Sequence, residues 1–508
     1  MKINQRFIFG LLIALTFISA SAQAQFSQSF GYFEDALRYS QTQTGGTARM
    51  QALGGAGTAV GGEISSAWLN PAGLGMMQHS GFFGSPFLTV GSTDASYLNT
   101  ETTDFRLNAN VSQFGGAFHI PNRNVNSKYK GGTIAFTFSR MADFQNNLTY
   151  QGTSDSLSII DYFLERAQGI AWSELDNEIS GGIFSDEGLA YQTFLINPDL
   201  DFDTGNENTY FSFVEPARHE QQEIIQRRGA QNQWNLAYGG NYDDILFFGA
   251  SVGIQSFRYE QERTYSEFYG STSPLNDLDY RDQLTARGVG ANLSLGAILR
   301  LPMFRLGWQI VTPTIMYVDE EYTADLLVNY NNVEFESFTL NQEFGETVIL
   351  ESNYLMTTPF RTSLGASIFV GKSGFITGEV EYVNYSQARL FEPSFAQNLE
   401  GDNDVIRNLY ASALNFKGGA EIRIDPIRIR GGVAYYADPV DDAFDQSQII
   451  YSGGLGFVND NFAFDLVVKM QQFDQAYSPF TFSNPQFNPN VDFQTSRLTL
   501  GTSFSFFF

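Results

Sequence analysis

The chain has 508 residues, with 55 Asp and Glu against 29 Lys and Arg, and no Cys. The formal net charge of −26 argues against nucleic acid as a partner, because its phosphates would be repelled, and the lack of Cys excludes disulfides and thiol chemistry. The 48 Phe, 25 Tyr and 48 Gly accompany only 17% charged residues, against roughly 25% in an average soluble domain. Aromatic residues and Gly in this proportion favour closely approaching strands.

The first 24 residues are typical of a secretory signal peptide. Lys2 and Arg6 precede an apolar run over residues 7–18, and small residues follow it. The run is shorter than the roughly 20 residues of a membrane-spanning helix. We expect cleavage after Ala22 or Ala24, and no later stretch reaches the ~18 apolar residues that mark such a helix. The sequence therefore predicts an exported protein without a helical membrane span.

Residues 25–79 follow neither the pattern of a long helix nor that of an alternating strand. Residues 30–41, "FGYFEDALRYSQ", place Phe30, Phe33 and Leu37 on one face of a short amphipathic helix. Irregular backbone cannot face hydrocarbon. We therefore expect this segment in the periplasm or inside a barrel, where the helix would dock in the lumen.

From residue 80 onward, apolar and polar residues alternate with a period of two, which indicates β-strands. One face is apolar, as at Leu498, Leu500 and Phe504, and the other carries Gly, Ser, Thr and Asn with few charges. A soluble sandwich would carry a Lys- and Glu-rich outer face, whereas this composition suits a barrel whose apolar face meets lipid. We count fourteen strands, near 80–91, 107–119, 131–143, 231–241, 245–264, 283–300, 304–328, 346–370, 374–390, 411–424, 427–437, 449–458, 461–473 and 494–508.

The connections alternate in length, which supports an all-β, 14-stranded antiparallel transmembrane barrel. Short turns such as "NYDD", "LPMF" and "NDN" belong on the periplasmic side, and long loops belong outside. The expected long loops are 144–230, 265–282, 329–345, 391–410, 438–448 and 474–493. In the longest, about 144–230, a helix is expected from the spacing of Ile159, Ile160, Phe163 and Leu164. It either captures ligand or, as we favour, packs the loop.

The stretch "TGGTARMQALGGAGTAVGGEISSAWLNPAGLGMM", residues 44–77, resembles the N-terminal region of the outer-membrane hydrophobic-compound transporters of the FadL/TodX type. The matching residues are Gly54, Gly55, Gly57, Glu63, Asn70, Pro71, Ala72 and Gly73. Thr312-Pro313 and Thr358-Pro359 inside long strands extend the likeness, as does the terminal Phe508, of the kind that the barrel-assembly machinery favours.

This resemblance implies that residues 25–79 are a hatch that plugs a fourteen-stranded barrel formed by residues 80–508. It also implies passive uptake of hydrophobic small molecules such as long-chain fatty acids across the outer membrane. Substrate would be captured outside, bound in the lumen and released sideways into the lipid when the hatch shifts. Outer-membrane lipid and lipopolysaccharide would surround the barrel. The open alternative for the hatch is a static stopper.

Inward-facing charges gather near the periplasmic end of strands 9 to 11. They are Glu379, Glu381, Lys417, Glu421, Arg423, Arg428 and Arg430. Charges in a barrel interior are normally satisfied by neighbours or water, so we expect a paired belt. The sharper hypothesis is that some of these groups tether the hatch or meet a substrate carboxylate.

Other functions have weaker support in the sequence. His79, His119 and His219 lack metal-ligand spacing, so neither a metal nor a cofactor is expected, and haem binding is only a weak suggestion. Scattered Ser residues give no Ser/His/Asp arrangement, so we do not expect an enzyme. The remaining alternatives are a non-transporting barrel that docks secretion or assembly machinery, and a water-filled porin.

Overall fold

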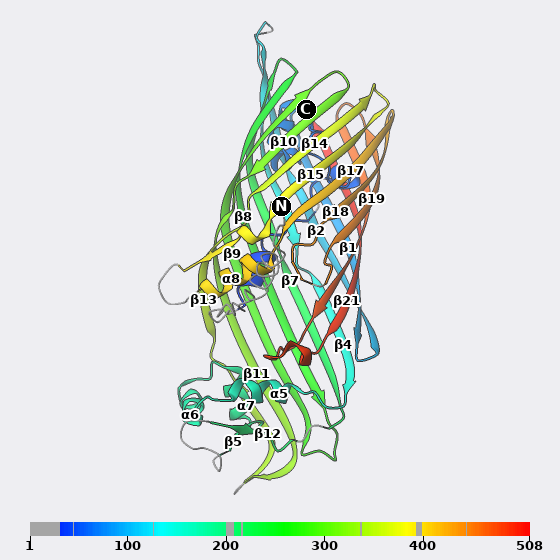
Figure 1. The fold of residues 1–508 in the computed structure, drawn as a ribbon. Helices are drawn as coiled ribbons and strands as arrows, with labels where there is room; N and C mark the ends of the chain where they lie inside the picture. The colour runs from blue at the N-terminus through cyan, green and yellow to red at the C-terminus, as the bar shows by residue number, and fades with distance from the viewer. Residues whose placement is uncertain are drawn as a thin grey trace, which may run out of the picture.

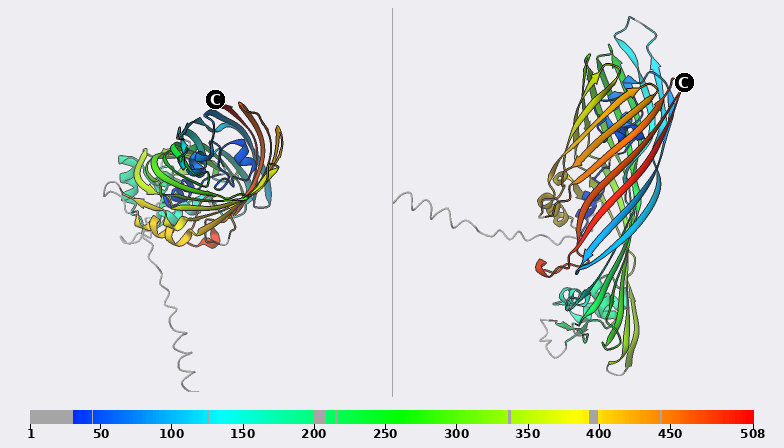
Figure 2. Two further views of the ribbon diagram at one scale, coloured as in Figure 1. Left: turned by 90° about the horizontal axis from the view of Figure 1, so that it is seen from above. Right: turned by 90° about the vertical axis from the view of Figure 1, so that its right-hand side faces the viewer.

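The computed structural model describes residues 31–508 except 44, 125, 200–207, 215–216, 336–337, 393–398 and 443. These residues form a long closed barrel with an N-terminal segment inside it (Figures 1 and 2). The barrel closes because β1 (Gly81–Tyr97) pairs antiparallel with β2 (Thr100–Pro121) on one side and with β21 (Val491–Phe507) on the other. The expected signal peptide and Phe30 lie outside the described residues.

The barrel has fourteen antiparallel strands, which confirms the predicted fold class. Several strands are interrupted and therefore carry two or three labels. After β1 and β2 they are β3 (Tyr129–Asp143) with β4 (Asn146–Ser154), β7 (His219–Tyr242), β8 (Leu246–Phe268), β9 (Leu275–Arg300), β10 (Phe304–Val311) with β11 (Ile315–Phe335), β12 (Phe338–Glu346) with β13 (Leu350–Thr357) and β14 (Arg361–Val370), β15 (Gly374–Asn384) with β16 (Arg389–Phe391), β17 (Ser412–Ile424), β18 (Ile427–Tyr436), β19 (Gln448–Val458), β20 (Phe462–Tyr477) and β21.

The two Thr-Pro pairs mark two of these interruptions. Proline has no N–H to donate to a ladder, and β10 ends just before Thr312-Pro313 while β13 ends just before Thr358-Pro359. The two breaks lie opposite each other, because the Thr314 N–H donates to Thr358 Oγ1 at 2.9 Å and the Thr358 N–H donates to the Thr314 carbonyl at 3.0 Å.

The wall is uneven, which the sequence did not predict. Strands β4, β7, β8, β9, β11 and β12 continue far beyond the rest (Figure 1). The predicted loops 265–282 and 329–345 are therefore mostly strand, and the loop predicted at 144–230 is strand at both ends. Residues 92–106 likewise form a hairpin that turns at Leu98 and Asn99, both with positive φ. Past the membrane the outward face need not be apolar, so the alternation that identifies strands fades there.

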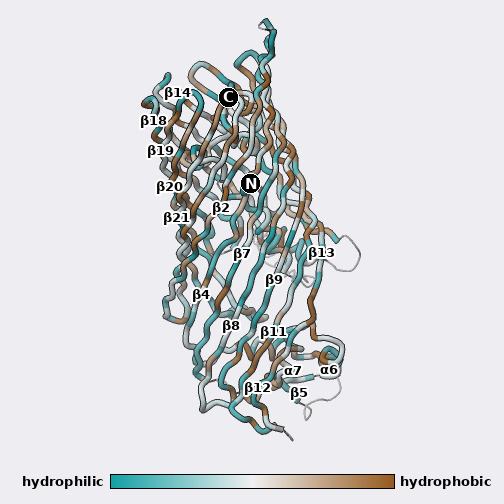
Figure 3. Tube along the Cα trace, turned by 180° about the vertical axis from the view of Figure 1, so that it is seen from behind, coloured by the Kyte–Doolittle hydropathy of each residue, from teal (hydrophilic) through white to brown (hydrophobic). Residues whose placement is uncertain are grey.

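A belt of exposed apolar side chains surrounds the end of the barrel that carries the short turns. Figure 3 shows hydrophobic and hydrophilic residues alternating along the strands there. On β8 the outward residues are apolar up to Ile254 and give way to Arg258, and on β9 they are apolar from Val289 and give way to Arg287. Such a band flanked by polar residues is the outer surface of a membrane barrel. The extended strands thus project beyond the lipid on the side of the long loops.

Helices occupy the lumen and the long loops. Inside the barrel lie α2 (Phe33–Arg38), α3 (Ala48–Ala52), α4 (Ser66–Leu69) and the 3₁₀ turn η1 (Pro71–Met76). Outside, α5 (Ile159–Ala167), α6 (Trp172–Gly181) and α7 (Asp186–Gln192) cover the extended strands, and α8 (Glu400–Leu409) lies in a second loop. None of the helices in the described part of the chain is both long enough and apolar enough to span a membrane.

Candidate functional site: the plugged lumen

The hatch (residues 25–79, of which 31–43 and 45–79 are described) lies in close contact with the wall of the barrel. A Cβ at Gly249 would collide with Pro71, one at Gly296 with Asn70, and one at Gly432 with Gly54. The wall glycines at which a Cβ would meet the hatch in this way are Gly239, Gly249, Gly296, Gly307, Gly365, Gly419, Gly432 and Gly454. Glycine is needed at these positions because any side chain would push the hatch away from the wall.

The Asn70-Pro71-Ala72 triplet connects the hatch to itself and to the wall. Asn70 Oδ1 accepts from the Ala72 N–H at 3.1 Å and so caps η1, which begins with Pro71. Asn70 Nδ2 donates to the Thr58 carbonyl at 2.7 Å and to the Trp308 carbonyl of β10 at 3.3 Å. This one side chain therefore links two hatch segments and a strand.

The remaining motif residues hold the hatch in its compact form. Buried Glu63 accepts from Thr47 Oγ1 at 2.7 Å, and Thr47 in turn caps α3. Gly54 and Gly55 both have positive φ, 67° and 78°, just after α3, where the chain turns. The last two glycines lie at tight contacts within the hatch, Gly57 against Leu69 and Gly73 against Gly61 and Ser66.

The predicted charge belt divides into two paired groups, and the first holds the middle of the hatch. Lys417 Nζ lies 3.1 Å from Glu379 Oε1 and 3.3 Å from Glu381 Oε2. Arg361 approaches Glu381 to 3.8 Å. The second oxygen of Glu379 accepts from the Thr58 N–H of the hatch at 2.9 Å. The carboxylate of Glu379 is therefore shared between a wall cation and the hatch backbone.

The second group holds α3. Arg430 lies 2.8 Å from Glu421 and 2.5 Å from Asp465, and Arg423 is also 2.8 Å from Glu421. Arg49 of α3 reaches the same Glu421 at 3.3 Å, so a hatch cation joins the wall charges. Arg428 is the cross-strand partner of Arg423 and lines the same cavity, but its ion pair is with the exposed Asp425 at the β17–β18 turn.

The predicted loop helix is α5, and it packs against other elements instead of lining a cavity. Ile159, Ile160 and Phe163 are buried with α7 and the inner face of β9 and β11, and Leu164 is partly buried against the same cluster. This placement agrees with the favoured interpretation, in which the helix supplies the core of its own loop.

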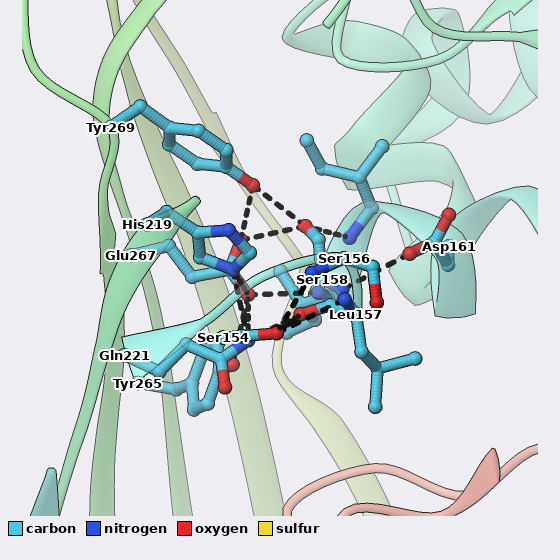
Figure 4. A network of polar contacts seen from close by, with 12 residues as sticks. Ser154, Ser156, Leu157, Ser158, Asp161, His219, Gln221, Tyr265, Glu267 and Tyr269 are labelled. Atoms are coloured by element: carbon cyan, nitrogen blue, oxygen red, sulfur yellow. Dashed lines mark hydrogen bonds and ion pairs between the residues drawn. The ribbon is translucent and has the colours of Figure 1, made fainter. Parts of the chain in front are cut away.

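A buried carboxylate fixes the start of α5 to β8 (Figure 4). Glu267 accepts from Ser158 Oγ at 2.6 Å, from the Ile159 N–H at 2.9 Å, from Tyr269 OH at 2.7 Å and from Tyr265 OH at 2.9 Å. His219 Nε2 lies 3.5 Å from the same group, with both side chains fully buried.

The ionisation of this pair follows from its surroundings, which lie beyond the apolar belt. Burial alone would raise the pKa of Glu267, but the hydrogen bond and charge of His219 outweigh it, so the pKa is lowered. Burial alone would lower the pKa of His219, but the hydrogen bond and charge of Glu267 outweigh it, so the pKa is raised. A carboxylate and an imidazolium therefore anchor the helix.

Two other histidines lie elsewhere. His79 is at the end of the hatch, just before β1, and His119 Nδ1 lies 3.2 Å from Thr133 Oγ1 near the opposite end of the barrel from α5. Within the ranges that the structure describes, no three His, Asp or Glu side chains gather as metal ligands would.

Several cavities lie between the hatch and the wall, and three of them follow one another from the outer mouth inward. The outermost, which we call the vestibule, has a volume of about 860 Å³ and lies between α2, the inner face of the extended strands and Phe184. Its apolar lining includes Tyr32, Leu284, Tyr322 and Ile349. The vestibule, rather than α5, therefore offers apolar surface at the outer mouth.

Helix α2 separates the vestibule from the next cavity. The Tyr354 hydroxyl lies within hydrogen-bond distance of two carboxylates, at 2.8 Å from Asp35 of α2 and at 2.6 Å from Glu320 of β11. Burial and the neighbouring Asp35 raise the pKa of Glu320. Asp35 also forms an ion pair with Arg38 of the same helix. The Tyr354 hydroxyl thus links α2 to the wall.

The second cavity, the lumenal cavity, lies on the other side of α2 from the vestibule and has a volume of about 70 Å³. It is lined by Tyr39, Trp68 and Leu69 of the hatch and, on the wall, by a row of amides. These amides are Gln231, Gln233, Gln255, Asn292 and Gln309. The third, the seam cavity, has a volume of about 60 Å³ and shares Gln43 and Gly45 with the lumenal cavity.

The seam cavity adjoins a gap in the backbone ladder between β2 and its neighbour, which we call the seam. Among the described residues, the β2–β3 ladder runs only from Gln113↔Ser139 to Pro121↔Gly131. Further out, side chains span the two strands. Asn110 Nδ2 donates to Asp143 at 3.0 Å, Arg106 to Gln145 at 2.6 Å, and Thr149 Oγ1 to Asp104 at 2.8 Å.

These features define a fourteen-stranded membrane barrel plugged by its own N-terminal segment. The solved toluene transporter TodX of P. putida is similar, with a TM-score of 0.51, 10% identity, and coverage of 92% of this chain and 99% of that one. A FadL homologue of Pseudomonas aeruginosa is similar with a TM-score of 0.52, again with 10% identity and coverage of 92% and 99%. The fold is thus that of FadL/TodX-type outer-membrane transporters, which confirms the fold that the resemblance implies.

Comparison at the level of sequence adds nothing to this. No family model matches the chain, and no curated protein matches it.

The sequence analysis missed the amide row, the vestibule and the seam. The amide row had a readable signal, because Gln231, Gln233 and Asn235 share one parity of a strand. The vestibule had none, because its lining comes from α2, from four strands and from the segment after α6. The seam depends on pairing between strands, which composition does not record.

Proposed function

We propose that this protein is an outer-membrane channel for passive uptake of hydrophobic small molecules, such as long-chain fatty acids. A molecule enters the vestibule, passes into the lumenal cavity when the hatch rearranges, and leaves sideways through the seam into the lipid. The toluene transporter with the same fold supports this substrate class. Passive transport of this kind makes and breaks no covalent bond.

One observation carries the proposal. The three cavities lie in series and only hatch segments separate them. Residues 35–40 stand between the vestibule and the lumenal cavity, and Gln43 with Gly45 lies between the lumenal cavity and the seam cavity. Opening the route therefore requires displacement of the hatch but no change in the barrel ladder.

The seam gives the proposed exit. Its outward residues Phe105 and Leu107 are 67% and 66% exposed, so apolar side chains flank its outer side. Side-chain hydrogen bonds in place of a backbone ladder hold it closed, and because each of the three involves an Asp or Arg side chain it contributes about 1.5–3 kcal/mol at most. A few of them can open without unfolding a strand.

The test uses the absence of native Cys. One pair, Gln51→Cys with Ser112→Cys, joins the hatch to β2, where Gln51 Nε2 now donates to Ser112 Oγ at 2.9 Å. A second pair, Asn110→Cys with Asp143→Cys, joins the two sides of the seam. Each pair is closed with a short cleavable bismaleimide in proteoliposomes, and uptake of labelled long-chain fatty acid is measured.

Both cross-links should stop uptake, and cleavage should restore it. The control pair is Val468→Cys with Leu500→Cys, which face lipid on neighbouring strands β20 and β21, and its closure should change nothing. Continued uptake with the seam closed would refute lateral release, and continued uptake with the hatch fixed would refute hatch rearrangement. Lack of uptake of fatty acids, alkylbenzenes and haem by the unmodified protein would favour a docking role, whereas large ion conductance would indicate a porin.

A further inference from the structure

The lumenal cavity carries unpaired polar atoms on both the wall and the hatch. The side-chain carbonyl oxygens of Gln231 and Asn292 are buried and have no hydrogen-bond partner. Tyr39 OH, Ser40 Oγ and the Trp68 indole N–H of the hatch are also buried without a partner. All five residues line this one cavity, and Gln231, Asn292, Tyr39 and Ser40 are each at most 6% exposed. Buried polar groups are ordinarily paired, so five unpaired atoms around one cavity indicate a missing ligand.

The orientation of the two amides is fixed by their other contacts. Gln231 Nε2 donates to the Tyr39 carbonyl at 3.2 Å and to Gln255 at 3.3 Å, and a carbonyl can only accept. Asn292 Nδ2 donates to Thr314 Oγ1 at 3.0 Å and to Gln233 Oε1 at 3.3 Å. In both amides the nitrogen is engaged and the oxygen is free. The wall therefore presents two acceptors that require a donor.

The charged groups around the cavity are already paired with one another. Lys417 contacts both Glu379 and Glu381, and Arg361 approaches Glu381 and donates to the Ser40 carbonyl. An ionised carboxylate entering the cavity would meet two cations that are already paired with two carboxylates, and two amide oxygens that repel it. A pure hydrocarbon would leave every unpaired atom without a partner, which is costly in a buried site.

We infer that the lumenal cavity binds the hydroxyl end of a neutral amphiphile, such as an alcohol or phenol. This inference rests on the proposed function and deepens it. Among the hydrophobic molecules that the channel admits, those with a neutral hydroxyl bind most tightly in this cavity, and ionised fatty acids pass through it with weaker binding. The hydroxyl donates to a free amide oxygen on the wall and accepts from Trp68 or Ser40 on the hatch. At about 70 Å³ the cavity holds roughly five water-sized groups. It is therefore a seat for a head group, while the apolar remainder extends past Trp68 and Leu69.

The seat also links substrate chemistry to the hatch, because its acceptors belong to the wall and its remaining unpaired groups belong to the hatch. A hydroxyl that contacts the wall and the hatch together supplies the missing hydrogen bonds of both parts of the protein. A molecule without a hydroxyl completes none of them. Selectivity of this kind exceeds what a purely apolar pocket achieves, since a site with buried polar groups rejects ligands that leave them unpaired.

The test compares three chain-matched ligands at pH 8: 1-dodecanol, 1-chlorododecane and dodecanoate. Binding to the full-length protein in lipid nanodiscs is measured by equilibrium dialysis, and binding to empty nanodiscs is subtracted. Dodecanol should bind at least tenfold more tightly than the other two, the effect expected of one completed buried hydrogen bond. Equal affinities for the three ligands would overturn the inference, as would a lack of saturable binding by all of them.

Variants locate the seat. Gln231→Leu and Asn292→Leu should each weaken dodecanol binding about tenfold and leave chlorododecane binding unchanged. Thr137→Val is the control, because it removes an equally buried and unpaired oxygen that lies outside the cavity lining. Ser40→Ala on the hatch gives a second readout should a wall variant fail to fold. Equal losses for both ligands would show a merely structural role and refute the seat.

Failure of this inference is distinguishable from failure of the proposed function. Chlorododecane uptake that stops when the hatch is cross-linked, together with equal binding of the three ligands, would leave the transport proposal intact and remove only the hydroxyl seat.

Discussion

Replacing Glu267 by Gln should release α5 from the extended strands. The substitution keeps the shape of the side chain but removes its charge and turns one oxygen into an NH₂ group that faces donors. The Ile159 N–H, the two tyrosine hydroxyls and the Gln221 amide all donate to this carboxylate, the last at 3.0 Å. His219 would also lose its counter-charge in a fully buried site.

The magnitude follows from these contacts. Hydrogen bonds to a charged group are worth about 1.5–3 kcal/mol each, roughly twice the neutral value. Several are weakened together, but part of the loss returns through relaxation and water, so we expect a cost of about 3 kcal/mol in the free energy of local opening. That corresponds to roughly a hundredfold increase in the population of the undocked loop.

The assay is hydrogen exchange of the peptide that contains α5, with peptides from the apolar belt as internal references. Exchange at α5 should accelerate about a hundredfold while the barrel peptides remain unchanged. Glu220→Gln is the matched control, since this neighbouring carboxylate on β7 is exposed. If α5 exchanges at the same rate in both variants, Glu267 does not anchor the loop and the electrostatic reasoning is wrong.

Three further expectations concern the hatch, the belt and pH. Gly432→Ala should displace the hatch, because overpacking costs about 1–3 kcal/mol, and ion conductance in planar bilayers should rise roughly tenfold. Gly431→Ala is the control, since a Cβ there has ample space and conductance should not change. Equal conductance of the two variants would refute the contact between the hatch and the wall. Arg430→Ala leaves two carboxylates buried and should lower the free energy of unfolding by about 3–5 kcal/mol, read as a lower urea midpoint. Arg428→Ala, whose partner is exposed, should cost below about 1 kcal/mol, and similar costs would contradict the pairing. Because folding raises the pKa of His219, its proton stabilises the docking of α5 fully below pH about 6.5, and this stabilisation is lost as the pH rises through the raised pKa. Hydrogen exchange of α5, corrected for the intrinsic effect of pH, should therefore be slower at pH 6 than at pH 9. An unchanged rate would show that protonation of His219 does not stabilise the docking of α5.

The barrel could be predicted from the sequence because lipid imposes a simple rule on it. Every second side chain must be apolar where the wall meets hydrocarbon, so segments such as 461–473 show a period of two, and fourteen of them were counted correctly. The rule ends where the lipid ends. On β8, for example, the outward residues beyond Ile254 include Arg258, and the strand continues to Phe268 with a mostly polar outward face. Strand ends and loop lengths were therefore wrong there.

The lumen was less predictable because its chemistry depends on which residues meet across the barrel. Inward parity placed Glu379, Lys417 and Glu421 on one face, but only the structure shows that Thr58 and Arg49 of the hatch contact Glu379 and Glu421. Parity also grouped Arg428 with these residues, although it pairs within its own turn. Partners more than 300 residues apart, such as Thr58 and Glu379, have no signal in a single sequence.

The abundance of glycine links these two levels. Gly239, Gly249 and Gly296 are direct partners across β7, β8 and β9, and all three face the Asn70-Pro71-Ala72 segment, so that three strands leave one continuous recess for it. A recess of this kind destabilises the isolated sheet, because glycine packs nothing and costs entropy on folding. It becomes favourable only when the hatch fills it. The glycines of the wall and the small residues of the hatch are therefore one feature divided between two parts of the chain, because the shape of each is favourable only in the presence of the other.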